Sequence, residues 1–173
     1  MPDERSEALS DDDFLEAFRT GALPLAAFDH RAHVRAGYLY VARYGLGLAI
    51  ERFGKTLRSF AETHGKTGLY HETITVAFLA LINERIAASG ATGEHGGWEA
   101  FAKANPDLFQ RNSLAPFYTP EELASPEARR VFLLPRRRGT KQNQNESTSP
   151  EAASASRVAM LKPAPEAGLV KKS

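Results

Sequence analysis

The spacing of apolar residues is the feature that most restricts how this chain can fold. Over four stretches, apolar residues recur every three or four positions, which is the spacing of one face of an α-helix. These stretches cover residues 11–20, 30–44, 46–64 and 70–89. No stretch alternates strictly between apolar and polar residues, as a half-buried strand does. The pattern therefore predicts an all-α protein.

Residues that begin and end helices stand at the borders of these stretches. Ser10 and Asp29 come directly before two of them, and side chains of this kind accept hydrogen bonds from the free N–H groups of a first turn. Gly21, Gly45 and Gly65 follow the last residues of three stretches. Glycine at such a position readily adopts the left-handed conformation that ends a helix. We therefore expect separate helices rather than one long one.

The later part of the chain predicts shorter helices and then a tail. A fifth helix is expected over 98–104, and prolines at first helical positions begin further short turns before 135. From residue 136 the chain is rich in Ser, Ala, Pro, Asn and Gln and has no aromatic residue. Such a segment buries too little apolar surface to offset the entropy of ordering. We predict a frayed N-terminus (1–9), a compact bundle of about five to seven helices (10–135) and a disordered tail (136–173).

Composition excludes several chemistries and partners. The chain has no cysteine, so disulfides, thiol catalysis and cysteine-bound metals are excluded. No apolar run approaches the ~20 residues of a membrane span, and the polar, acidic start does not resemble a secretory signal. We therefore expect a cytoplasmic protein. Residues 1–135 contain 14 Lys and Arg against 18 Asp and Glu, a net of −4, which argues against nucleic-acid binding by the helical domain.

The predicted topology gathers histidines at one end of the bundle. Short loops join helices 30–44, 46–64 and 70–89, so consecutive helices should be antiparallel neighbours. The start of the first, the end of the second and the start of the third then meet at one end. That end carries four of the five histidines, which are His30, His33, His64 and His71.

A histidine group of this kind has two functional interpretations. His30, His33 and His71 could bind a divalent iron, zinc or manganese ion, with Glu72 as a ligand or base. Without a metal, one histidine would transfer protons near neutral pH, and His71 and Glu72 are our catalytic candidates. In either case an anionic small molecule could be held by nearby polar groups, for which the candidates are Arg31, Lys66 and Tyr70.

The same histidines also have a structural interpretation. His30 could cap or pack the start of its helix, and His64 near a helix C-terminus could interact favourably with the helix dipole. Two hypotheses therefore stay open. The first is a small helical enzyme or enzyme accessory protein with a histidine-rich pocket. The second is a non-catalytic binding or interaction module.

Three stretches resemble a family of all-helical bacterial proteins to which no activity is assigned. They are FDHRAHVRAGYLYVARYG at 28–45, YHETITVAFLALI at 70–82 and NPDLFQRNSLAPFYTPEELASPEARRVFLLP at 105–135. The resemblance spans about 10–135 and rests on the motifs HRxHxR and YHETIT. The motif positions that it implies are His30, His33, His71, Glu72 and Thr73. They overlap with the histidine group reached from the topology.

Overall fold

Helices make up the regular structure of the computed structural model, which describes residues 8–89, 96–110 and 112–135. No strand occurs in these ranges, so the all-α prediction is confirmed. By its internal contacts the chain divides into two units, Met1–Arg138 and Gly139–Ser173. The predicted disordered tail and most of the predicted frayed N-terminus lie outside the described residues. Within the described part of the chain, no helix is both long and apolar enough to cross a membrane.

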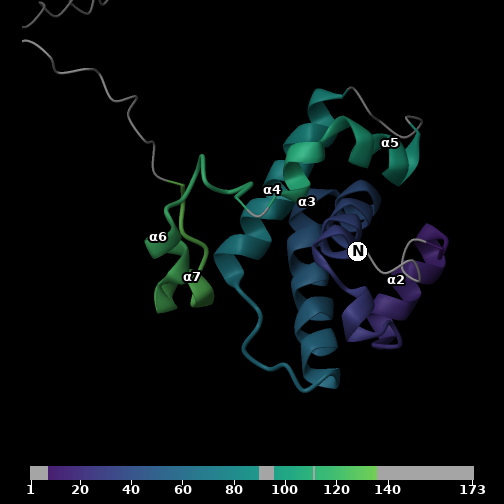
Figure 1. Ribbon diagram of the computed structural model, residues 1–173, viewed down its shortest axis with the longest axis horizontal. Helices are drawn as coiled ribbons and strands as arrows, with labels where there is room; N and C mark the ends of the chain where they lie inside the picture. The colour runs from purple at the N-terminus through teal and green to yellow at the C-terminus, as the bar shows by residue number, and fades with distance from the viewer. Residues whose placement is uncertain (1–7, 90–95, 111, 136–173) are drawn as a thin grey trace, which may run out of the picture. The chain divides into compact units, whose positions relative to one another are not determined.

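Figure 1 shows how the helices of the first unit follow one another. Four carry the core, and two short ones follow near the end of the described chain. In order they are α2 (Asp11–Thr20), α3 (His30–Thr63), α4 (Glu72–Ala88), α5 (Gly97–Ala104), α6 (Pro120–Ala124) and α7 (Pro126–Arg130), with the 3-10 turns η1 (Leu25–Ala27) and η2 (Pro106–Phe109).

Helix α3 is broken at Gly45 into two arms, residues 30–44 and 46–63. Gly45 has φ 70° and ψ 164°, a conformation that is essentially reserved for glycine. The two arms fold back on each other, since the Tyr40 hydroxyl and Thr56 Oγ1 are hydrogen-bonded at 2.8 Å. The Tyr40 ring also meets Phe53 edge-on. Gly45 therefore separates two helical arms that pack on each other, as the glycine at this position predicted.

The predicted N-caps form as expected. The Ser10 side chain accepts a hydrogen bond from the Asp13 N–H, and Asp29 accepts one from the Ala32 N–H at 2.9 Å. Gly21 ends α2 in the left-handed conformation, with φ 77°. These ends are encoded locally, because each depends on one side chain or one glycine and its nearest neighbours.

Helix α4 packs against both arms of α3. A Cβ at Gly37 on the first arm would lie only 3.0 Å from Ile82 Cδ1, so a glycine here permits the close approach of the two helices. On the second arm, Arg58 donates a hydrogen bond to Glu72 at 2.9 Å and lies 3.8 Å from the Tyr70 ring centroid. These contacts place α4 alongside the hairpin that the two arms form.

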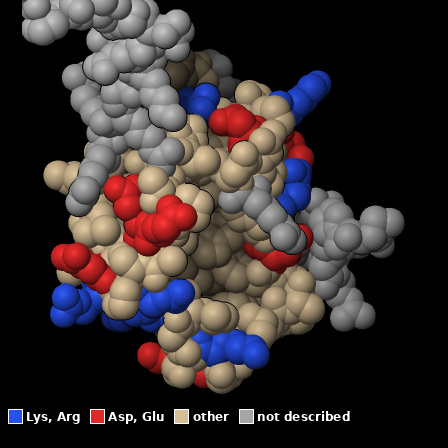
Figure 2. All heavy atoms as spheres, turned by 60° about the vertical axis from the view of Figure 1, so that its left-hand side comes forward, with Lys and Arg blue, Asp and Glu red and all other residues tan. Residues whose placement is uncertain are grey.

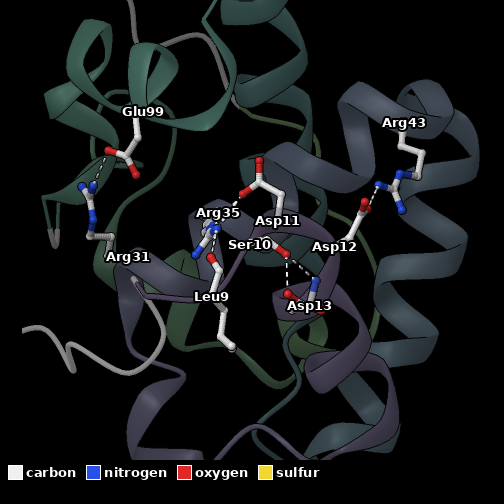
Figure 3. Close-up of polar contacts among 9 residues, drawn as sticks. All are labelled: Leu9, Ser10, Asp11, Asp12, Asp13, Arg31, Arg35, Arg43 and Glu99. Carbon is white, nitrogen blue, oxygen red and sulfur yellow. Dashed lines mark hydrogen bonds and ion pairs between the residues drawn. The ribbon is translucent and has the colours of Figure 1, made fainter.

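Helix α2 is held to the first arm of α3 by a buried arginine. The Arg35 side chain is 8% exposed and donates to Asp11 Oδ1 from Nε at 3.0 Å and from its terminal nitrogen at 2.6 Å. It also donates to the Leu9 carbonyl at 2.9 Å (Figure 3). The guanidinium lies 4.6 Å from the Phe14 ring centroid. The ion pair of Arg35 and Asp11 therefore joins α2 to the first arm of α3.

The end of the described chain, residues 118–133, is attached to α4 by Thr73. The Thr73 side chain is fully buried. Its hydroxyl donates to the Val131 carbonyl at 2.8 Å and accepts from the Leu133 N–H at 3.0 Å. The Tyr118 hydroxyl donates to the Leu133 carbonyl, also at 2.8 Å. An extended piece of chain is therefore held by hydroxyl groups rather than by a sheet.

Replacing Thr73 by Val is expected to loosen this attachment. Valine has nearly the same shape but can neither donate to Val131 nor accept from Leu133, so two backbone groups lose their partner. We expect a loss of about 2 kcal/mol in the free energy of unfolding and faster hydrogen exchange at the Leu133 amide. Thr63→Val is a matched control, because its hydroxyl only bonds the Ser59 carbonyl at an exposed position. Unchanged protection of Leu133 in Thr73→Val would contradict the role assigned to this hydroxyl.

Candidate functional site

A small cavity lies between the two arms of α3 and α4. Its volume is about 140 Å³. Apart from two histidines and one threonine, the side chains around it are aliphatic or aromatic. The lining residues are His30, His33, Val34, Gly37, Phe53, Ile74, Thr75, Phe78, Leu79 and Ile82.

His33 is the unusual member of this lining. Its ring packs against Phe28 and Phe53, with centroid distances of 5.1 and 5.5 Å. Neither ring nitrogen has a hydrogen-bond partner among the described residues. Burial, with a smaller contribution from the charge of neighbouring His30, lowers the pKa of His33 from 6.5 to about 4. The imidazole is therefore neutral near pH 7 and lines the apolar cavity without a hydrogen bond to any described residue.

His30 shares the cavity but is anchored. Its Nε2 lies 3.0 Å from the Leu108 carbonyl oxygen, and because a carbonyl can only accept, Nε2 carries the hydrogen and donates. The ring also meets Phe78 edge-on at 5.5 Å. His30 therefore connects η2 to the cavity wall, whereas His33 has no comparable anchor in the described part of the chain.

His71 has a structural position outside the cavity. Its Nδ1 accepts from the Ile74 N–H at 3.3 Å, which makes it the N-cap of α4. Its Nε2 donates to the Leu123 carbonyl at 2.8 Å. Both ring nitrogens are thus used, one to begin α4 and the other to hold the end of α6. The two motif residues that follow also make structural contacts. Glu72 accepts a hydrogen bond from Arg58, and Thr73 donates one to the Val131 carbonyl near the end of the described chain.

The predicted group of four histidines is therefore divided. His64 donates from Nδ1 to the Phe60 carbonyl at 3.0 Å and packs on the Phe60 ring, which matches its structural interpretation. Only His30 and His33 line the cavity. Among the described residues, no three His, Asp or Glu side chains are placed to hold a metal ion. The predicted ligand set of His30, His33 and His71 with Glu72 is not brought together there.

The predicted anion-binding residues also lie elsewhere. Arg31 pairs with Glu99 at 3.5 Å and lies over the Trp98 and Phe109 rings. Tyr70 lies under Arg58, and burial together with Glu72 raises its pKa to about 12. Lys66 is exposed in the turn after α3. None of the three lines the cavity.

A second and larger hollow was not anticipated from the sequence. This groove has a volume of about 840 Å³ and lies between the start of α2, the first arm of α3, the end of α4 and α5. Asp11 and Asp12 stand on its edge, although the sequence suggests only that they stabilise the start of a helix. Asn105, which is 8% exposed, is among its lining residues.

Charged residues do not form one continuous patch on the face drawn in Figure 2. Acidic and basic side chains lie next to one another at several places there, around a central hollow whose visible surface is mostly uncharged. The described residues on that face therefore form no basic stripe of the kind that follows a phosphate backbone.

Comparisons of the chain with protein-family models, characterised proteins and solved structures found no match. The resemblance drawn from the HRxHxR and YHETIT motifs stays a prediction. The geometry of the cavity and the groove is therefore the basis for assigning a function.

Proposed function

We propose that the protein binds a small, uncharged, flat molecule in the cavity of His30 and His33, and that His33 anchors it by a hydrogen bond. The observation that carries this proposal is the partnerless imidazole of His33 in an otherwise apolar lining. His33 is partly buried, and its ring nitrogens are not among the sealed, unsatisfied atoms of the described residues, so a small molecule can reach them. A phenylalanine or leucine would complete the apolar lining without a polar atom, so a binding role gives a reason for the histidine.

The size of the cavity restricts the ligand. An apolar cavity of about 150 Å³ accommodates one benzene-sized molecule, and the cavity here is about 140 Å³. Phe53 and Phe78 supply ring faces and edges, while Val34, Leu79 and Ile82 supply aliphatic contacts. A single aromatic ring with one small polar group is the size and chemistry that this space favours.

The charge of the lining favours an uncharged ligand and binding rather than catalysis. No Lys or Arg is among the lining residues, and His33, with its pKa lowered to about 4, is neutral near pH 7. An anion would therefore lose its hydration without gaining an opposite charge. A base with so low a pKa is also poorly matched to proton transfer near neutral pH. These features support a ligand-binding protein whose histidine recognises a hydroxyl or N–H group.

Phenol and toluene test the proposal, because they have similar shapes and differ in one hydroxyl. We expect phenol to bind the wild-type protein about tenfold more tightly than toluene, since one hydrogen bond contributes about 1 kcal/mol or more. In His33→Phe this preference should disappear, because the ring nitrogens are gone. Titration calorimetry or ligand-observed NMR would measure both affinities.

His64→Phe is the matched control, since it makes the same substitution outside the cavity. It should leave the preference for phenol unchanged. Benzoate, an anion of similar width, should not bind. Equal binding of phenol and toluene to the wild-type protein, or binding of neither, would overturn the proposed function.

A further inference from the structure

We propose that the groove between α2, α3, α4 and α5 is a second binding site, and that it takes an organic ammonium group attached to an apolar body. This proposal is independent of the cavity, because the two sites share no lining residue. At about 840 Å³ the groove falls within the range of small-molecule pockets, roughly 300–1,000 Å³.

Asn105 is the first observation that points to a ligand with hydrogen-bond donors. The residue is more than nine-tenths buried, and its Nδ2 donates to the Phe101 carbonyl at 2.9 Å. This bond fixes the orientation of the amide, so the other atom is the acceptor Oδ1. Oδ1 has no partner among the described residues, yet it is not one of their sealed, unsatisfied atoms. A buried side chain therefore presents an unused acceptor to the groove that it lines.

The carboxylates on the edge of the groove add further acceptors. Asp11 uses Oδ1 for Arg35, and Asp12 uses Oδ1 for Arg43 (Figure 3). The second oxygen of each carboxylate makes no hydrogen bond in the described part of the chain. The groove thus offers three unused acceptor oxygens from two separate elements. An ammonium group, which has donors and no acceptor, can bind oxygens of this kind, in competition with Arg43, which also lines the groove.

The rest of the lining suits an apolar or aromatic body. Tyr38 and Phe101 pack with their ring centroids 4.5 Å apart, and both line the groove together with Leu39 and Ile86. Burial and the nearby Asp11 raise the pKa of Tyr38, so its hydroxyl stays protonated and neutral. Aromatic faces also attract cations. The groove is therefore lined both by acceptor oxygens, which suit the ammonium group of an arylalkyl ammonium ion, and by aromatic side chains, which suit its ring.

Benzylamine and benzyl alcohol test this inference, because they differ mainly in whether the polar group is a cation at pH 7. We expect benzylamine to shift the side-chain amide NMR signals of Asn105 and Asn83, both of which line the groove. Benzyl alcohol should shift them far less at the same concentration. Asp12→Asn should weaken benzylamine binding about threefold, as expected for an exposed charge. Arg43→Gln should strengthen it, because Arg43 competes for the Asp12 carboxylate.

Asp13→Asn is the matched control. Asp13 belongs to the same helical turn and carries the same charge, but it pairs with Ser10 and does not line the groove. It should leave benzylamine binding unchanged, and so should His33→Phe in the other site. Equal weakening by Asp13→Asn and Asp12→Asn, unmoved Asn105 signals, or equal binding of benzyl alcohol would overturn the proposal.

Discussion

Acidification from pH 7 to pH 4 is expected to reduce the free energy of unfolding by up to about 3 kcal/mol through His33 alone. In the folded protein the pKa of His33 is lowered from 6.5 to about 4. Between these values the unfolded chain binds a proton at this residue and the folded protein does not. The unfolded state is then favoured as the pH falls, so the contribution of His33 is complete above pH 6.5 and declines towards pH 4.

Denaturant unfolding at several pH values would measure this effect, and His33→Phe isolates it. The variant lacks the titrating group, so its stability should fall less steeply between pH 6.5 and pH 4. At pH 7 it should also be more stable than the wild type by about 1 kcal/mol, because an unpartnered polar group has been replaced by an apolar ring. His64→Phe makes the same substitution at a histidine outside the cavity and serves as the control. If His33→Phe and the wild type had the same slope, the burial assigned to His33 would be wrong.

Replacing Asp11 by Ala is the second change with a large expected effect, a loss of about 3 kcal/mol in the free energy of unfolding. The substitution removes the carboxylate that pairs with Arg35, whose side chain is only 8% exposed. The guanidinium would keep its bond to the Leu9 carbonyl, but it would lose the carboxylate that two of its nitrogens contact in a buried position. Denaturant unfolding at constant pH measures this loss.

Asp12→Ala is the matched control for Asp11→Ala. Its partner Arg43 is 46% exposed, so water can replace the lost ion pair and the cost should stay below about 1 kcal/mol. Arg35→Met should also cost less than Asp11→Ala, because the Asp11 side chain is 41% exposed and can be rehydrated. Equal losses for Asp11→Ala and Asp12→Ala would show that the ion pair of Arg35 and Asp11 does not hold α2 against α3.

The sequence predicted the features of the fold that depend on near neighbours. The caps at Ser10 and Asp29 each require one oxygen three residues before its N–H partner. The break at Gly45 requires one residue that tolerates a positive φ. The sequence also predicted that His30 and His33 lie together, because residues three apart share a helix face.

The contacts of the other histidines could not be predicted in this way. His71 donates to a carbonyl 52 positions away, and His30 to one 78 positions away. Helical periodicity gives the face of a residue but not the loop that will cover it. It therefore could not show that His71 would be fully used as a cap and a tether. The groove was missed for a similar reason, since the free oxygen of Asn105 follows from the orientation of a single amide.

Because α3 is broken at the single residue Gly45, the cavity depends on the number of residues in α3 as well as on which residues line it. The two arms of α3 meet at this one glycine, so there is no loop in which an extra residue could be absorbed. One inserted residue after Gly45 would turn the later side chains of the arm by about 100° around its axis. Phe53 would then leave the His33 ring that it now contacts. Phe53 therefore stays beside His33 in the cavity wall only while no residue is inserted at Gly45.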